Sequence, residues 1–175
     1  MIIEFEGKKP KVHEQAYIVE SAQIIGDVEI GAQSSVWFNA VVRGDIHFIR
    51  IGERTSIQDL CVIHVTKDKY PTIVGNDVTL GHGVILHGCT IKDMCLIGIG
   101  SVVLDDAVIG PECLVAAGSL ITPGFKAEPG TLIMGRPAKT IRKLNDKELE
   151  LIRNVKDKYI SYIARYKEDA KKKQN

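Results

Sequence analysis

The chain has 175 residues, 45% of them hydrophobic and 6% aromatic, and a formal net charge of +1 at pH 7. Such a chain can bury a core without disulfide bonds, and its near-neutral charge argues against a nucleic-acid partner. No signal peptide and no segment of membrane-spanning length is recognisable, so we expect a cytoplasmic protein without a membrane partner.

Aliphatic residues recur every six positions through most of the chain. Neither an amphipathic helix nor an alternating strand has this period. It is typical of a left-handed parallel β-helix, in which three hexapeptides form one triangular coil and each coil packs on the next. We therefore predict an all-β fold of this kind in residues 1–140. The repeat comprises Ile18, Ile24, Ile30, Val36 and Val42, then Ile51, Ile57 and Ile63, then Val74, Leu80 and Leu86, and finally Ile91, Ile97, Val103, Ile109, Val115 and Ile121.

Small residues support this register. Glycine follows the aliphatic residue at six places, including Gly81 and Gly98, where a tight corner favours a residue without a Cβ. The four cysteines each lie two residues before a repeat aliphatic, and no Cys-x-x-Cys pair occurs. We interpret them as small core side chains rather than as metal ligands, a redox pair or disulfides. They are Cys61, Cys89, Cys95 and Cys113.

A C-terminal α-helix is predicted within residues 141–175. Asn145 and Glu148 have the spacing of a capping box at its start. An apolar stripe at helical spacing then predicts packing on the β-helix of the same chain or of a neighbour. The stripe comprises Leu149, Ile152, Tyr159, Ile163 and Tyr166.

Three histidines occupy informative positions in the repeat. We treat the irregular stretches after Asp45 and His64 as loops that bulge from corners, which places Val42, Ile63 and Leu86 on one wall. His64 and His87 then stack on adjacent coils, about 4.8 Å apart, and can converge on one metal ion. His82 follows Leu80 on another wall and cannot easily join them within one chain.

A homotrimer would resolve this geometry, because each cleft between subunits could combine His64 and His87 of one chain with His82 of the next. Three neutral imidazoles suit Zn²⁺, with Co²⁺ or Fe²⁺ as alternatives, and leave a coordination position open for catalysis. Arg43 follows Val42 on the same wall, so Arg43 and Asp45 are expected next to the histidine column at the same cleft.

The segments Val42-Arg43-Gly44-Asp45, Ile57-Gln58-Asp59 and Gly81–Gly88 resemble the signature of the γ-class carbonic anhydrase family, as does Gly135–Lys139. The resemblance implies a lyase that hydrates CO₂ to bicarbonate. It implies that the three histidines bind the metal and that Gln58 orients the attacking hydroxide. It also implies that Arg43, Asp45 and Asp59 hold the trimer interface, with Asp59 counted among the catalytic candidates.

Two further positions follow from the same resemblance. Tyr159 aligns with a family tyrosine near the active site. The family's proton-shuttle glutamates are absent, because their places hold Ile46 and the stretch 65–70, which leaves the proton-shuttle residue and the level of hydratase activity open.

Two other functions stay open on the sequence. Hexapeptide proteins often transfer acyl groups with a single histidine as general base, and related proteins hydrolyse acyl-CoA thioesters. A non-catalytic, metal-binding trimer is the third interpretation.

Overall fold

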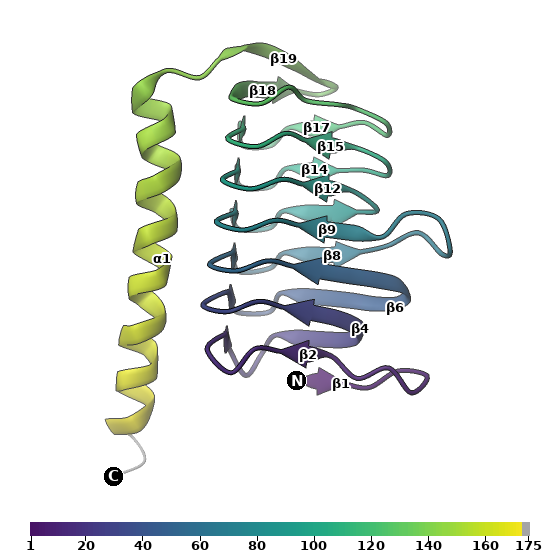
Figure 1. Cartoon of the computed structure of the whole chain (residues 1–175), viewed down its shortest axis with the longest axis vertical. Helices are drawn as coiled ribbons and strands as arrows, with labels where there is room; N and C mark the ends of the chain where they lie inside the picture. Colours follow the sequence, from purple (N-terminus) through teal and green to yellow (C-terminus); the bar gives the residue numbers. More distant parts are fainter. Residues whose placement is uncertain (173–175) are drawn as a thin grey trace.

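The computed structural model describes residues 1–172 as a left-handed parallel β-helix with one long helix, α1 (Asp146–Lys172), beside the stack of coils (Figure 1). The predicted fold class is confirmed. The division at residue 140 stays a prediction, and the last strand of the β region runs to Lys143 before the helix begins. Residues 173–175 of the expected helical region lie outside the described part of the chain.

Three walls make up each coil. The histidine wall contains β1 (Ile2–Ile3), β8 (Val62–His64), β11 (Ile85–His87), β14 (Val102–Val103) and β17 (Leu120–Ile121). The helix-side wall contains β3 (Tyr17–Ile18), β5 (Ser35–Val36), β7 (Ser56–Ile57), β10 (Thr79–Leu80), β13 (Leu96–Ile97), β16 (Leu114–Val115), β18 (Thr131–Gly135) and β19 (Ala138–Lys143). The third wall contains β2 (Lys11–Val12), β9 (Thr72–Val74), β12 (Thr90–Ile91) and β15 (Val108–Ile109).

Two long strands connect the histidine wall to the third wall. They are β4 (Gln23–Ile30) and β6 (Val41–Ile51), which pair in parallel and continue around the corner. Residues 46–51 belong to β6, but the pairing shifts from Gly26–Gly44 to Val28–Ile49, so three extra residues bulge from the corner after Gly44, as expected. The stretch after His64 also bulges as expected, as a hairpin closed by a bridge between Thr66 and Tyr70 that protrudes from the stack (Figure 1).

The repeat aliphatics pair in register from coil to coil and form the core. On the histidine wall, Ile63 pairs with Val42 below and with Leu86 above, and all three are fully buried. Ile18, in the first coil, is only partly buried. The four cysteines are buried and free, as predicted, and burial raises the pKa of Cys61, Cys89 and Cys95 to about 12. These thiols are therefore packing groups.

The glycines that follow the aliphatics are needed for close stacking. A Cβ at Gly98 would lie 2.5 Å from the backbone nitrogen of Ala117, and one at Gly81 would lie 2.8 Å from that of Ile99. The left-handed backbone conformation expected of a tight corner occurs two residues later, at Gly83 and Gly100. Steric exclusion by the next coil therefore explains the first set of glycines.

Helix α1 begins as predicted. The Asn145 side chain accepts a hydrogen bond from the Glu148 N–H at 3.0 Å, and Glu148 accepts one from the Asn145 N–H at 2.9 Å. Ile163 of the predicted stripe belongs to the buried core of the β-helix of the same chain, and Ile152 is also buried. Tyr166 is partly exposed, although its ring packs 5.1 Å from that of Trp37.

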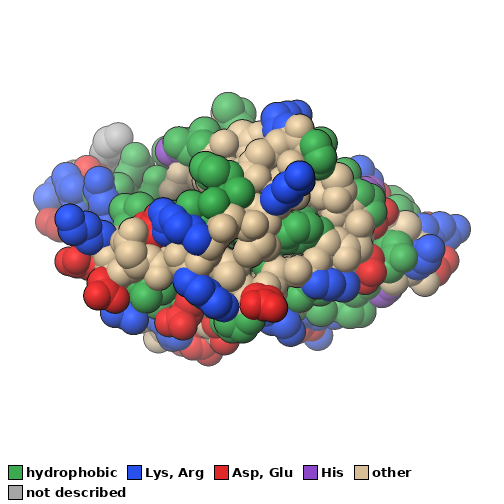
Figure 2. Space-filling model, turned by 90° about the horizontal axis from the view of Figure 1, so that it is seen from above, with side chains coloured by type: hydrophobic (Ala, Val, Ile, Leu, Met, Phe, Trp, Pro, Cys, Tyr) green, Lys and Arg blue, Asp and Glu red, His purple; other side chains and the backbone are tan. Residues whose placement is uncertain are grey.

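The end of the stack that carries β18 and β19 has basic and acidic side chains interspersed around its rim (Figure 2). This mixture matches the small net charge of the chain. Among residues 1–172, no helix is both long enough and apolar enough to cross a lipid bilayer.

Candidate metal centre

His64 and His87 lie side by side at the ends of paired strands. The register of β8 with β11 places His87 directly opposite His64 on the next coil, as the repeat predicted. His64 Nδ1 and His87 Nε2 face each other at 3.3 Å. Adjacent coils thus bring two imidazole nitrogens to one point on the outer surface of the histidine wall.

Carboxylates engage the other nitrogen of each ring. His64 Nε2 lies 3.0 Å from Asp45 Oδ1, and His87 Nδ1 lies 2.7 Å from Asp105 Oδ1. An ionised carboxylate only accepts hydrogen bonds, so in a neutral imidazole these outer nitrogens carry the hydrogen. The two nitrogens that face each other, His64 Nδ1 and His87 Nε2, then both carry lone pairs. This arrangement requires a proton or a metal cation between them.

Arg43 reinforces the carboxylate next to His64. Its guanidinium pairs with Asp45, whose side chain is largely buried. Although burial raises the pKa of Asp45, hydrogen bonds from His64 and Arg43 and the Arg43 charge hold that pKa below its usual value. Asp45 is therefore ionised at neutral pH and available as an acceptor for the His64 ring.

His82 lies apart from this pair, on the turn after β10. Its Nδ1 is 2.8 Å from Asp59 Oδ2, and Asp59 Oδ1 also accepts a hydrogen bond from the Phe38 N–H at 3.0 Å. Asp59 thus lies one coil from His82. Within residues 1–172, no group of three histidine, cysteine or acidic side chains is placed to hold one ion.

Gln58 directly precedes Asp59 in the chain, and Tyr159 lies near enough for the charge of Asp59 to act on its hydroxyl. Gln58 is buried and, in the described part of the chain, its side chain forms no hydrogen bond. Tyr159, on α1, packs against Trp37 with ring centroids 5.7 Å apart. Burial, and then the charge of Asp59, raise the pKa of the Tyr159 hydroxyl.

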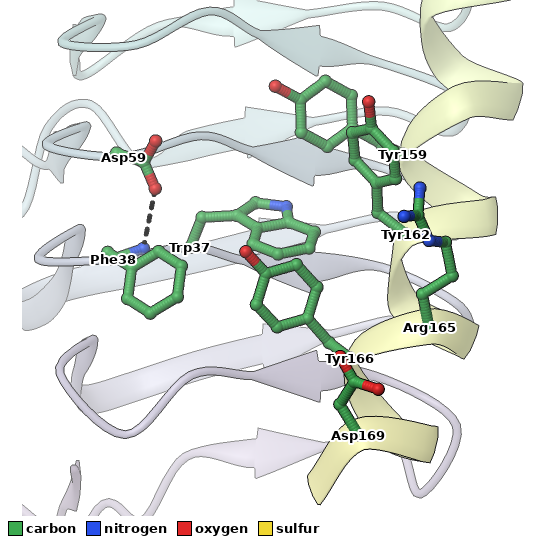
Figure 3. A pocket seen from close by; sticks show the side chains of 8 residues that line it. All are labelled: Trp37, Phe38, Asp59, Tyr159, Tyr162, Arg165, Tyr166 and Asp169. Atoms are coloured by element: carbon green, nitrogen blue, oxygen red, sulfur yellow. Dashed lines mark hydrogen bonds between the residues drawn. The ribbon is translucent and has the colours of Figure 1, made fainter.

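A cavity of about 430 Å³ opens between α1 and the corner that carries Asp59 (Figure 3). Its lining is mainly aromatic and includes Trp37, Phe38 and three tyrosines of α1. Trp37 is fixed there, because its indole N–H donates to the hydroxyl groups of Ser35 and Ser56. Asp59 and Tyr159 therefore share one cavity that adjoins His82.

Asp105 is the site residue that the sequence interpretation missed. It follows β14 and lies 18 residues after His87, whereas the coil from β11 to β14 has 17 residues, since Leu86 pairs with Val103, so Asp105 lies over Gly88. The repeat places Asp105 on the coil after His87 but one position out of register, and its side chain reaches the His87 ring from there.

The donor set fits a metal ion. Two nitrogens bound at about 2.0–2.1 Å to one tetrahedral zinc ion lie about 3.4 Å apart. The inner nitrogens of His64 and His87 match this separation, at 3.3 Å. A histidine that binds a metal through one ring nitrogen usually donates a hydrogen bond from the other to a carboxylate. Each of the three histidines has a carboxylate next to one ring nitrogen.

Comparison with known proteins shows to which family the chain belongs. A family model described as bacterial transferase hexapeptide (six repeats) matches residues 88–123. A protein named carbonic anhydrase from Geobacillus kaustophilus is 41% identical over 167 residues, which cover 95% of this chain and 91% of that protein. The chain belongs to the γ-class carbonic anhydrase family. The resemblance seen in the sequence motifs is thereby confirmed.

Other similar proteins differ in length and description. The mitochondrial gamma carbonic anhydrase 1 of Arabidopsis thaliana is 41% identical over 150 residues, covering 83% of this chain. The chain spans only about half of that plant protein, 54% of its length. A solved structure of a hexapeptide transferase family protein from Anaplasma phagocytophilum has a TM-score of 0.89 and 39% identity, covering 94% of this chain and 97% of that one.

Proposed function

We propose that this γ-class family member is a metal-dependent lyase that hydrates CO₂ to bicarbonate at the clefts between subunits of a homotrimer. The observation that carries the proposal is the pair of opposed imidazole nitrogens of His64 and His87, each ring held from behind by a carboxylate. Membership of the carbonic anhydrase family supports the choice of reaction.

His64, His82 and His87 are the proposed metal ligands, with Zn²⁺ as the first candidate and Co²⁺ or Fe²⁺ as alternatives. A zinc ion held by three imidazoles lowers the pKa of its water to about 7 and so supplies a nucleophile at neutral pH, an effect for which carbonic anhydrase is the standard example. The chain's own contribution is orientation. Asp45, Asp59 and Asp105 fix the three rings, and Arg43 balances the charge of Asp45.

Gln58 is the proposed orienting group for the attacking oxygen. Its amide can both donate and accept a hydrogen bond, and it has no partner among the described side chains that would compete. It precedes Asp59 and so lies at the same corner as His82. The other proposed catalytic residues near this corner are Asp59 and Tyr159.

Apolar exposure around the histidine pair supports assembly. Val62 and Ile85 pair across β8 and β11, each two residues before its histidine, and both are exposed. Leu60 and Ile99 are exposed at the adjacent corner that carries His82. Exposed apolar patches of this kind mark protein contact sites. In the proposed trimer they line the cleft, and Asp59 of one subunit faces Arg43 of the next.

We expect Ile85→Lys to dissociate the trimer to monomers, because it places a charge in the proposed cleft. Light scattering coupled to size exclusion measures the mass. Ile73→Lys is the matched control, since Ile73 is 38% exposed against 40% for Ile85 but faces outward from the third wall. A wild-type monomer, or equal dissociation by both variants, would contradict the proposed cleft.

Zinc-loaded protein is expected to hydrate CO₂ in a stopped-flow assay with a pH indicator. Imidazole belongs in the assay as an added proton carrier, because Ile46 and the hairpin after His64 replace the family's shuttle glutamates. Absence of hydration by zinc-loaded trimer, with and without imidazole, would reject the proposed reaction.

Gln58→Ala is expected to lower the hydration rate on the order of 100-fold while zinc content and trimer mass stay unchanged, because a misplaced nucleophile loses its positional advantage. Gln33→Ala is the control, since Gln33 lies on a distant corner beside α1. Equal rates for wild type and Gln58→Ala would remove Gln58 from the mechanism.

Acyl-thioester chemistry is the second candidate, and the aromatic cavity favours it. A volume of about 430 Å³ is far larger than CO₂ needs and is in the range of sites for larger organic ligands. An acyl-CoA thioesterase assay on the same zinc-loaded protein distinguishes this function, and inactivity in both assays with retained zinc would indicate a binding module.

A further inference from the structure

Asp105 connects the hairpin after His64 to the histidine pair. One carboxylate oxygen, Oδ1, lies 2.7 Å from His87 Nδ1. The other, Oδ2, accepts a hydrogen bond from the Thr66 hydroxyl at 2.9 Å. Thr66 is itself fixed in the hairpin, where its N–H donates to the Tyr70 carbonyl at 3.0 Å.

We propose that Asp105 is a positioning residue that sets the tautomer and ring orientation of His87, and that Thr66 orients Asp105. This inference rests on the proposed metal function of His87. Because the carboxylate accepts the Nδ1 hydrogen, Nε2 is left with its lone pair directed at His64 Nδ1. Without Asp105 the ring is free to rotate or to carry its hydrogen on Nε2, and either change removes the ligand.

Gly88 gives Asp105 access to the ring. A Cβ at position 88 would lie 2.4 Å from Asp105 Oδ1, and the residue also has a φ of +57°, which favours glycine. The glycine directly after the ligand histidine is therefore explained by the approach of this carboxylate. The His87 ring is thus held by Asp105, which Thr66 orients and for which Gly88 leaves space.

The test compares two neighbouring aspartates. Asp105→Ala removes the acceptor and is expected to weaken zinc binding by about 10-fold to 100-fold, the usual cost of losing a partner behind a metal ligand. Asp105→Asn removes the charge but keeps an acceptor, so an intermediate loss is expected. Asp106→Asn is the matched control, because it removes the same charge from an exposed side chain that pairs with Lys126. Competition with a chromogenic chelator measures the zinc dissociation constant.

The imidazole nitrogen shifts of metal-free protein, measured by NMR, supply a second readout that needs no metal. Wild-type protein and Asp106→Asn are expected to hold His87 in the Nδ1–H form, and Asp105→Ala is expected to show a mixture of tautomers. Thr66→Val leaves the carboxylate in place, so if Asp105→Ala does not fold, Thr66→Val still reports a smaller loss in the same direction.

Unchanged zinc affinity and an unchanged His87 tautomer in Asp105→Ala would overturn the inference and leave the proposed function intact. A wild-type protein that binds no zinc would overturn the proposed function, and the NMR comparison would still decide the role of Asp105.

Discussion

Replacing His87 by alanine is expected to remove nearly all zinc from the protein and to leave the β-helix folded. His87 supplies one of two nitrogens that face each other at 3.3 Å, so the variant loses half of the site that a single chain provides. The loss in affinity is expected to exceed the roughly 100-fold upper range for an outer partner. The fold is expected to persist because the buried aliphatic stack, rather than an ion, forms the core.

Zinc content after dialysis, measured by elemental analysis, and far-UV circular dichroism together check this prediction. His82→Ala is expected to behave in the same way, although His82 belongs to another wall. His13→Ala is the control, since His13 is exposed and its Nδ1 accepts a hydrogen bond from the Gln15 N–H. Full zinc retention by His87→Ala, or its unfolding, would contradict the assignment.

Leu86→Ala is expected to lower the free energy of unfolding by about 2–5 kcal/mol, the usual cost of truncating a fully buried leucine. Leu86 is completely buried between its partners Ile63 and Val103 on the neighbouring coils, so both lose contacts. Denaturation of metal-free protein in urea measures the change without a contribution from zinc binding.

Ile73→Ala is the control for this truncation, because its side chain points outward from the third wall and is 38% exposed. A change within about 0.5 kcal/mol is expected there. A similarly small effect of Leu86→Ala would mean that the stacked aliphatics contribute less to stability than their burial indicates.

Periodicity made most of the fold and part of the site predictable. Once the coil length is known, residues separated by whole coils must stack, so His64 and His87 could be placed together and His82 apart. The start of the helix was also predictable, because Asn145 and Glu148 form hydrogen bonds with each other within one turn. Whether the three histidines meet on one ion depends on contacts between chains and stays a prediction.

The structure of irregular stretches was harder to predict, because extra residues in a coil can form a loop or lengthen a strand. After Asp45 both happen: the chain stays in β6, but residues 45–48 bulge away from β4, and pairing with β4 resumes at Ile49. Asp105 was missed for a different reason. Its role requires a position one residue out of register with His87 and the absence of a Cβ at Gly88, and both conditions are visible only in three dimensions.

Helix α1 also changes how the coils depend on one another. In a simple repeat stack, each coil contacts only its neighbours, so the terminal coils can unfold separately. Here the helix starts next to the last coil and runs back along the stack (Figure 1). On the way Lys156 pairs with Asp77 at 3.7 Å, and near its end Lys167 donates to the Gln15 carbonyl at 3.3 Å. The helix thus joins residues 152 positions apart, and the two ends of the stack are expected to melt as one cooperative unit.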